Sequence, residues 1–525
     1  MSASRVILTA GAVLVQIAWA LTAGDAMAAP RPQVNPEGQR QADQGNGTYL
    51  NPVLAGDHPD PSVLKDGDTY YATFSSFESY PGLVVWSSKD LLNWQPVTAA
   101  LSHYVGSVWA PCLVKYRGRY LIYFPARSDS YRSNYVIWAD QIEGPWSAPI
   151  DLHLPKHIDP GFAVGEDGKP YLFLSGGDRV ALSDDGLSTA GQPQHVADPF
   201  PIPDDWDIES QSVEGPKITR HGDWFYMIWA EGGTAGPPTG HMVVVARSKS
   251  IDGPWQLDPH NPIIRTLNKS EPWWSKGHGS LVETPHGWSM VYHAYENGYM
   301  TLGRQMLMEP VEWTKDGWFR VARRDLSRPI AAPFQHDPHH PLSGMALSDD
   351  FANNSLGLRW SFYRGGDPAR AQFAGGLTLQ AAGTSPKDSA PLLETAPDQA
   401  YEIETEVTLD PGATAGVVLF YNENLYAGLG VSHDHLILHR YGTERPGDKP
   451  AGLGDHLFIR MRNNHQIVSF YTSPDGRSWT KYGVEMEVSG YNHNVGGGFL
   501  ALRPGIYVAG SGSAHFSHWR YHALP

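Results

Sequence analysis

The sequence has 525 residues, of which 41% are hydrophobic and 11% aromatic, so it can bury the cores of roughly two or three domains. Its formal net charge of −16, with no basic run to offset it, argues against a nucleic-acid partner or an anionic membrane surface. The 55 glycines and 42 prolines, together with the scarcity of helical periodicity, favour turns and short strands over helices.

Residues 1–28 are predicted to be a secretory signal peptide. Arg5 supplies a positive start, the stretch Val6–Thr22 is largely apolar, and residues 26–28 (Ala-Met-Ala) form a small-x-small cleavage site. A retained membrane anchor is the alternative, but the apolar run is short and no other segment is long enough to span a bilayer. Residues 29–50 are rich in Pro, Gln and Gly and are predicted to be a tether, and the mature protein is expected to be secreted or periplasmic.

The single cysteine, Cys112, lies in an apolar setting (Trp-Ala-Pro-Cys-Leu-Val). Without a second cysteine an intrachain disulfide is impossible, so an exported protein of this sequence must rely on packing. A lone cysteine among apolar residues is usually a small buried hydrophobe, and we predict that role for Cys112 in preference to a catalytic thiol.

A turn that ends in glycine, followed by an aromatic-rich strand, recurs five times in the first 300 residues. The copies read DGDTYYATF, RGRYLIYF, DGKPYLFL, HGDWFYMIW and HGWSMVYH, and their glycines are 51, 50, 54 and 65 residues apart. A period near 50 residues with short strands is typical of a four-stranded propeller blade, and such blades stack radially because one blade cannot bury its own faces. We therefore predict an all-β chain that begins with a five-bladed β-propeller over residues 51–331. A linear β-solenoid is the alternative, but its period is normally shorter and stricter.

Each of the five glycines is preceded by a segment that begins with a functional side chain. The segments are DPSVLKDG, WAPCLVKYRG, DPGFAVGEDG, EGPKITRHG and HGSLVETPHG, and they start at Asp60, Trp109, Asp159, Glu214 and His278. These segments are predicted to be the first strands of the blades, which line the propeller axis. A purely structural repeat would supply the same residue each time, whereas here the residue varies while its position is kept. We therefore expect the five side chains to meet at one axial opening.

Such a meeting of side chains has the chemistry of glycoside hydrolysis. Two carboxylates beside a pocket can act as general acid and general base, and a third can raise the pKa of the acid by like-charge repulsion. The aromatic rings of Phe77, Trp109 and Phe124 offer faces for a sugar ring, although each could instead pack in a blade core. His278 is either an ion ligand or a hydrogen-bonding wall residue, because no HxH or HExxH spacing supports a dedicated metal cage.

Several motifs, in order and with family-like spacing, resemble glycoside hydrolase family 43. They are NPVLAGDHPDPS, YPGLVVWSSKDLLNW, SVWAP, IDPG, SVEGPK and YMTLGRQMLMEPVEW, and they cover about Asn51–Pro329. That family comprises inverting β-xylosidases, α-L-arabinofuranosidases and arabinanases on a five-bladed propeller. One departure is Cys112, where the family commonly has aspartate after WAP, and this departure bears on the polarity of the sugar subsite.

The resemblance implies a role for each residue of the candidate site. Asp60 would be the general base, Glu214 the general acid, and Asp159 the group that orients the acid and tunes its pKa. Phe77 would line the sugar subsite, and Arg304 would reach into it. His278 would be the channel histidine, beside a Ca²⁺ or Na⁺ ion or a water molecule, and the reaction would require no cofactor.

After the repeats, residues 332–345 are predicted to be a linker rich in Pro and His, and residues 346–525 an antiparallel β-sandwich. Alternating strands such as YEIETEVTL, GVVLFYN, HLILHRY, HLFIRMR and QIVSFYTS indicate the sandwich, and SPDGRSW indicates a tight hairpin within it. This part resembles the concanavalin A-like domain attached to family 43 β-xylosidases. It could close the pocket with a loop, serve as an accessory without substrate contact, or be an independent carbohydrate-binding module.

The sequence therefore predicts an exo-acting hydrolase of terminal pentoses, foremost a β-D-xylosidase acting on xylo-oligosaccharides or arabinoxylan. An α-L-arabinofuranosidase is the alternative on the same scaffold. Two other classes stay open, namely a non-catalytic sugar-binding propeller and a retaining enzyme of the related invertase-type propeller. The expected partner is an oligosaccharide or polysaccharide, with no nucleic acid and no membrane after signal cleavage, and the oligomeric state is not fixed.

Overall fold

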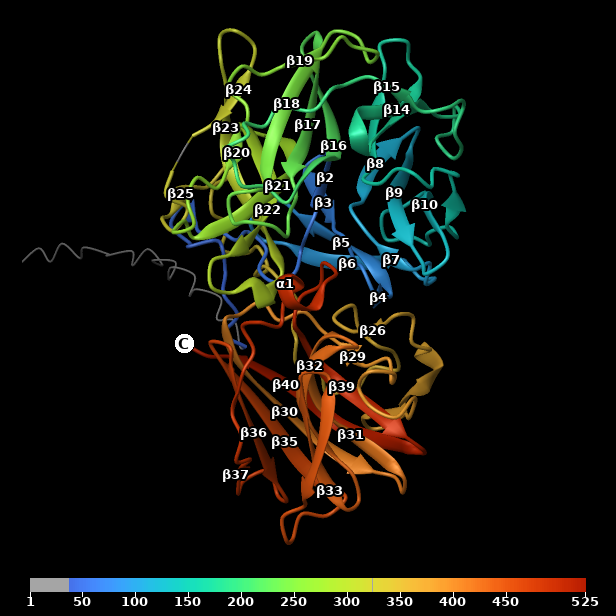
Figure 1. Ribbon diagram of the computed structural model, residues 1–525, viewed down its shortest axis with the longest axis vertical. Coiled ribbons are helices and arrows are strands. Elements are labelled where there is room, and N and C mark those ends of the chain that lie inside the picture. The colour runs from blue at the N-terminus through green and yellow to red at the C-terminus, as the bar shows by residue number, and fades with distance from the viewer. Residues whose placement is uncertain (1–36, 323) are drawn as a thin grey trace, which may run out of the picture.

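The computed structural model describes residues 37–322 and 324–525 as two β-rich domains stacked along the long axis of the molecule (Figure 1). The first domain is a ring of five antiparallel sheets, and the second is built from two large antiparallel sheets. The predicted all-β architecture of a five-bladed propeller followed by a β-sandwich is therefore confirmed. The predicted signal peptide over residues 1–28 lies outside the described residues. No helix within the described ranges has the length and apolar character needed to cross a bilayer.

The five sheets of the propeller follow one another along the chain, with the first strand of each sheet nearest the axis. Blade I contains β2 (Ser62–Asp66), β3 (Thr69–Thr73), β5 (Gly82–Ser88) and β6 (Gln95–Leu101). Blade II contains β7 (Ser107–Val108), β8 (Cys112–Tyr116), β9 (Arg119–Arg127), β10 (Arg132–Ala139) and β11 (Ile150–Asp151). Blade III contains β12 (Gly161–Val164), β13 (Pro170–Leu174), β14 (Asp178–Ala181) and β15 (Gln194–His195), with the turn η1 (Ser175–Gly177) before β14. Blade IV contains β16 (Ser210–His221), β17 (Trp224–Gly232), β18 (Met242–Ser248), β19 (Gln256–Leu257) and β20 (Ile264–Arg265). Blade V contains β21 (Trp273–Thr284), β22 (Gly287–Glu296), β23 (Arg304–Trp313) and β24 (Phe319–Val321), with the turn η2 (Met300–Leu302) before β23.

The repeated glycine sits in the hairpin between the first two long strands of each blade. All five of these glycines have positive φ, between 59° and 137°: Gly67, Gly118, Gly168, Gly222 and Gly287. A residue with a Cβ is strained in this left-handed region, so glycine is the residue that lets each hairpin turn tightly. The repeat read from the sequence is therefore a repeat of one turn geometry.

The N-terminal segment closes the ring by pairing with the last blade. The amide of Val53 donates to the carbonyl of Met306 (2.8 Å), and the amide of Met306 donates to Leu54 (3.2 Å). Just upstream, β1 (Thr48–Tyr49) pairs with β25 (Ile330–Ala331), which follows blade V. Residues 37–50, which belong to the predicted tether over residues 29–50, are thus packed against the fold, because their backbone groups find partners in both domains.

The second domain is a sandwich of two eight-stranded sheets. In spatial order the first sheet contains β34 (Thr443–Asp448), β33 (His435–Arg440), β32 (Leu425–Val431), β31 (Ala413–Asn422), β39 (Arg503–Gly510), β29 (Leu392–Leu393), β26 (Ser361–Tyr363) and β4 (Ser79–Tyr80). The second contains β27 (Ala371–Phe373), β28 (Leu377–Gln380), β40 (Ser513–Ala523), β30 (Ala400–Leu409), β35 (His456–Asn464), β36 (Ile467–Ser473) and β37 (Thr480–Lys481), and β38 (Met486–Glu487) also pairs with β36. The short helical elements η3 (Pro368–Arg370) and α1 (His493–Gly496) lie in its connections.

Strand β30 shows how the sequence alternation produces this sandwich. Its Tyr401, Ile403 and Val407 are at most 1% exposed and face the opposite sheet, whereas Glu402 and Glu404 between them face outward. Successive residues of a strand point to opposite faces, so an alternating sequence buries one face only. The predicted strands and the hairpin after β36 are therefore confirmed.

The two domains share a sheet, because β4 belongs to the propeller segment and pairs with β26 of the sandwich. Arg503 Nη1 donates to Ser361 Oγ (3.3 Å) and also to Ser79 Oγ, one residue from each domain. The predicted linker over residues 332–345 runs along blade I, where the amide of Gly344 donates to Trp94 (2.9 Å). The sandwich is consequently fixed against one side of the propeller rather than loosely attached.

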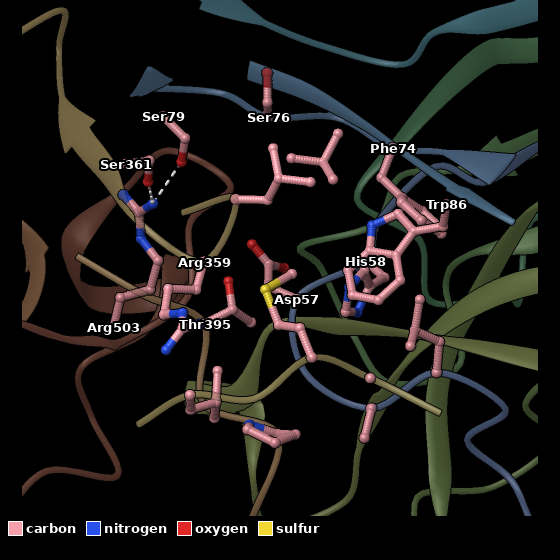
Figure 2. Close-up of a pocket in the computed structure, with 18 of the residues that line it drawn as sticks. Asp57, His58, Phe74, Ser76, Ser79, Trp86, Arg359, Ser361, Thr395 and Arg503 are labelled. Carbon is pink, nitrogen blue, oxygen red and sulfur yellow. Dashed lines mark hydrogen bonds between the residues drawn. The ribbon is translucent and has the colours of Figure 1, made fainter. Parts of the chain in front are cut away.

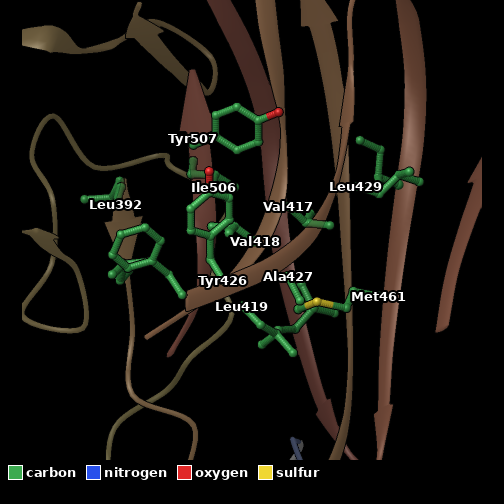
Figure 3. Close-up of a cluster of buried hydrophobic side chains, with 14 of the residues drawn as sticks. Leu392, Val417, Val418, Leu419, Tyr426, Ala427, Leu429, Met461, Ile506 and Tyr507 are labelled. Atoms are coloured by element: carbon green, nitrogen blue, oxygen red, sulfur yellow. The ribbon is translucent and has the colours of Figure 1, made fainter. Parts of the chain in front are cut away.

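Leu429 lies in the core of the sandwich, fully buried among the side chains shown in Figure 3. We expect Leu429→Ala to lower the free energy of unfolding by about 2–5 kcal/mol, because it removes buried methyl groups and leaves a cavity. Urea unfolding of the full chain measures this loss. The matched control is Leu267→Ala, since Leu267 is 54% exposed, and its effect should stay within about 0.5 kcal/mol. Equal effects of the two variants would contradict this account of the core.

Candidate active site

The five residues predicted to lie at the axis do meet at one end of the propeller channel. They line a pocket of about 90 Å³, and Phe77 and Arg304 line it with them. Its other walls come from Ala110, Ile158 and Thr234 of the propeller and from Phe499 of the sandwich. The convergence predicted from the repeat is therefore confirmed, whereas the catalytic roles of these residues remain predictions.

Three blades direct their axial residue into the pocket with the same unusual backbone. Asp60, Asp159 and His278 have φ values of 57°, 56° and 51°, in the left-handed region that residues with a Cβ rarely adopt. Such a conformation costs on the order of 1 kcal/mol or more and persists where the surroundings impose it. In blade IV the residue with positive φ is Gly215 (φ 62°), directly after Glu214, and a Cβ there would lie 2.5 Å from the His278 ring. Four of the five blades thus turn sharply just where the functional side chain enters the pocket, and blade II with Trp109 is the exception.

Asp60 is held by donors on both carboxylate oxygens. Arg304 donates from Nη1 to Oδ1 (2.8 Å) and from Nη2 to Oδ2 (3.3 Å), and Ser75 Oγ also donates to Oδ2. Its own amide donates to His293 Nδ1 (3.0 Å), which makes that nitrogen an acceptor and the ring neutral. Burial by itself raises the pKa of Asp60, but the positive charges of Arg304 and His278 outweigh it and hold the pKa well below its usual value. Asp60 is therefore ionised.

His278 connects the three carboxyl groups. Its Nδ1 lies 3.5 Å from Asp60 Oδ1, and its Nε2 lies 3.9 Å from Asp159 Oδ2 and 3.8 Å from Glu214 Oε1. Burial lowers the pKa of His278, yet the charges of the carboxyl groups prevail and raise it. A positive imidazolium is thus stabilised between Asp60 on one side and the Asp159–Glu214 pair on the other.

Asp159 and Glu214 titrate as a coupled pair with opposite shifts. Burial raises the pKa of Asp159 to about 7, and the Glu214 and Asp60 charges add to this while His278 opposes it. Burial also raises the pKa of Glu214, but the nearby imidazoles of His241 and His278 outweigh it and lower the pKa to about 2. Asp159 has a side chain only 5% exposed, compared with 18% for Glu214, so Asp159 loses more hydration as an anion. In the free pocket the proton of the pair therefore rests on Asp159.

Among the described residues, one group of three has the spacing of a metal site, formed by Glu214, His241 and His278. Their ligand atoms lie within 4.8 Å of one another, and the buried His241 Nε2, 3.2 Å from Glu214 Oε1, has no hydrogen-bond partner. Two imidazoles and one carboxylate suit Zn²⁺, whereas Ca²⁺ and Na⁺ take mainly oxygen ligands. This donor set therefore does not match the oxygen-rich sets of Ca²⁺ or Na⁺, one of the possibilities left open near His278.

The aromatic walls of the pocket come from both domains. Phe499 of the sandwich stacks on Phe77 (ring centroids 6.2 Å apart) and meets Trp109 edge-on at the same distance. The sandwich thus contributes a loop to the pocket, which was one of the three roles left open for it. Phe124 does not line the pocket, contrary to our prediction, because it is fully buried in blade II and stacks on Tyr135.

Cys112 is buried between blades II and III, where its Sγ accepts the amide of Phe162 (3.4 Å). It does not line the pocket, so its predicted role as a small buried hydrophobe is confirmed. The aspartate expected after WAP is replaced here by a residue that faces the blade core rather than the sugar.

Sequence reasoning missed His293, His241 and Phe499. His293 ends the repeat HGWSMVYH where the other copies end in Phe, Leu or Trp, and this exchange of an apolar for a polar residue was a readable signal. His241 precedes the apolar strand β18 as a lone histidine, and Phe499 lies 178 residues beyond Val321, where the last blade ends. Neither position carries a pattern that distinguishes it from ordinary packing.

A propeller whose axis gathers three carboxyl groups, an imidazole and aromatic walls is the scaffold of a glycoside hydrolase. Comparison with protein families agrees and is more specific. Residues 49–319 match the model of glycosyl hydrolases family 43, and residues 348–522 match the beta xylosidase C-terminal concanavalin A-like domain. The chain belongs to glycosyl hydrolase family 43.

The relatives extend over both domains. The chain is 27% identical to a xylan 1,3-beta-xylosidase from Vibrio sp, over 90% of this chain and 99% of that protein. It is 28% identical to a non-reducing end alpha-L-arabinofuranosidase from Bacteroides ovatus, over 89% and 92% respectively. Among solved structures, a GH43 protein from Bacillus licheniformis is similar with a TM-score of 0.80 at 28% identity, covering 91% of this chain and all of that one.

We expect Phe499→Ala to raise KM for a small aryl glycoside about tenfold, because the pocket loses a partly buried aromatic wall worth on the order of 1.5 kcal/mol. Steady-state kinetics measures the change. The control is Val495→Ala, in α1 of the same segment, whose side chain is 67% exposed and outside the pocket. An unchanged KM for Phe499→Ala would mean that the sandwich does not contact the substrate.

The Asp159 carboxyl should make the fold less stable as the pH rises. Between about pH 4 and pH 7 the unfolded chain has released this proton while the folded chain keeps it, so stability falls over this window and is constant above it. The free energy of unfolding of Asp159→Asn, relative to that of wild type, should therefore rise by about 2–3 kcal/mol from pH 5 to pH 8, because wild type loses about 1.4 kcal/mol per pH unit up to pH 7. Calorimetric melts at both pH values test this, with the exposed Asp184→Asn as a control that shows no such difference. A gap of the same size at both pH values would contradict the raised pKa.

Proposed function

We propose that this protein is an inverting exo-glycosidase that releases terminal β-D-xylose from xylo-oligosaccharides or arabinoxylan. The observation that carries the proposal is the contact of one imidazole, His278, with three carboxyl groups inside a small pocket. Both nitrogens of the ring are engaged, so Asp60 and the Asp159–Glu214 pair stand on different sides of it. This separation supports the two-carboxylate geometry of inversion, in which a water molecule fits between base and substrate.

Asp60 is the general base in this proposal, and Glu214 is the general acid. The bidentate Arg304 contact keeps Asp60 ionised and oriented, so it can take a proton from water as the water attacks the anomeric carbon. Glu214 donates its proton to the glycosidic oxygen as the bond to the leaving group breaks. One proton thus moves onto Asp60 and one leaves Glu214, which restores the original charge after exchange with solvent.

Glu214 must gain its proton before bond cleavage, although in the free pocket that proton rests on Asp159. Glu214 is the most exposed of the three carboxyl groups, with a side chain 18% exposed. A bound sugar removes this remaining water, which raises the pKa of Glu214 and draws the shared proton toward it. Asp159 therefore holds the proton until the sugar binds. Once Asp159 has lost this proton, its negative charge raises the pKa of Glu214.

The aromatic lining of the pocket supports removal of chain ends. Phe77 and Trp109 of the propeller line the pocket together with Phe499 of the sandwich, and the three rings contact one another. We infer that this group of rings limits how far a polysaccharide chain can extend beyond the bound sugar. The substrate is therefore an oligosaccharide or polysaccharide end, and the acid–base chemistry requires no cofactor.

An α-L-arabinofuranosidase on the same scaffold is the second candidate. It is favoured by the Bacteroides ovatus relative, which bears that activity in its name and matches over both domains. The same three carboxyl groups serve both reactions, so the choice between xylose and arabinofuranose depends on sugar-ring shape rather than on the acid–base pair.

We further propose that the protein acts outside the cytoplasm, as the signal-like residues 1–28 indicate.

Hydrolysis of aryl-β-xyloside and aryl-α-arabinofuranoside by wild type and Glu214→Ala tests the proposal. Wild type should hydrolyse the xyloside faster, and the variant should lose about 10²–10⁴-fold in kcat because the leaving oxygen is no longer protonated. Glu143→Gln, an exposed carboxylate outside the pocket, is the control and should keep wild-type rates. Equal, negligible rates for wild type and Glu214→Ala would refute the hydrolase mechanism.

The stereochemical course is read by NMR of the first sugar formed from a β-xyloside. Inversion gives α-xylose before mutarotation, and β-xylose as the first product would exclude the proposed mechanism. A faster reaction with the arabinofuranoside would instead select the second candidate.

A further inference from the structure

We propose that Asp57 is a positioning residue for the reaction, acting on the catalytic base through Arg304. The inference rests on the proposed role of Asp60 as base. Asp57 does not line the sugar pocket; it lies three residues before Asp60, at a second cavity between the propeller and the sandwich.

The segment from Asp57 to Asp60 forms hydrogen bonds with Arg304 at three points. Asp57 Oδ1 accepts the amide of Arg304 (3.2 Å), and the amide of His58 donates to the carbonyl of Arg304 (2.8 Å). At the far end of the same segment, the Asp60 carboxylate binds the Arg304 guanidinium. Backbone and side chain of one arginine are thus fixed by a single four-residue segment.

The Asp57 carboxyl group lies so close to residue 303 that only glycine fits there. Gly303 has φ of 76°, and a Cβ built on it would lie 2.1 Å from Asp57 Oδ1. The carboxyl group therefore occupies the space in which any other side chain at residue 303 would stand. A shift of Asp57 would move the backbone from which the Arg304 side chain reaches the base.

The other side of Asp57 faces the interdomain cavity shown in Figure 2, which has a volume of about 130 Å³. Arg359, Thr395 and Arg503 of the sandwich line this cavity opposite Asp57 and His58 of the propeller. Burial raises the pKa of Asp57 to about 7, with Arg304 and Arg503 opposing that rise. Below that pH the group is a neutral acceptor, so it holds the Arg304 amide without competing with Asp60 for the guanidinium charge.

Asp57→Ala and Asp57→Asn in the full chain test the inference. Alanine removes the acceptor, and we expect kcat for the aryl xyloside to fall about tenfold to a hundredfold with KM changed less than about twofold, because the base loses alignment. Asparagine keeps an acceptor oxygen and should recover most of that loss. Thr395→Val at the same cavity has no contact with Arg304 and should keep wild-type kcat and KM. Asp57→Ser, which is too short to reach the Arg304 amide, replaces the alanine variant if that protein fails to fold.

The outcomes separate this inference from the proposed function. A wild-type kcat in Asp57→Ala, a loss confined to KM, or an equal loss in the alanine and asparagine variants would overturn the positioning role. Those results leave the proposed mechanism intact as long as Asp60→Asn is inactive. An active Asp60→Asn would instead remove Asp60 as the base, whatever the Asp57 variants do.

Discussion

Burying three carboxyl groups around one imidazole is the constraint on which the rest of this structure depends. Anions that leave water lose several kcal/mol of hydration each, and like charges a few ångströms apart repel one another. Two cations and one retained proton offset this lost hydration and repulsion. Arg304 and His278 neutralise Asp60 and Glu214, while Asp159 keeps its proton. The division of roles among three chemically similar groups thus arises from their different partners and exposure.

The favourable contacts among these charged groups also explain the left-handed backbone at the candidate site. A left-handed backbone at Asp60, Asp159 and His278 is unfavourable in isolation, yet it directs three side chains from three blades to one point. The hydrogen bonds and ion pairs formed there offset that strain. A propeller is well suited to this task, because each blade brings the start of its first strand to the same axis.

The sandwich belongs to the catalytic unit rather than being an appended module. It extends its sheet through β4 of the propeller, supplies Phe499 to the sugar pocket, and places Arg503 at the cavity behind Arg304. An inserted or removed residue in this shared sheet would shift every side chain along it. The two domains therefore keep a fixed spacing, which a free linker would not provide.

Sequence alone determined the blade count, the axial ring and the alternating strands of the sandwich, because these follow from local turn chemistry and periodicity. The glycine turns that mark each blade are readable from a few residues, and so is the alternation of β30. Only the tertiary structure decided which of the side chains that end equivalent repeats reaches the candidate site: Phe124 packs inside its blade, whereas His293 accepts the amide of Asp60. It also decided that residues 37–50 are packed, that Phe499 enters the pocket, and that Asp159 holds the proton. Those outcomes depend on contacts between residues far apart in the chain and on burial, and neither property is carried by a residue and its immediate neighbours.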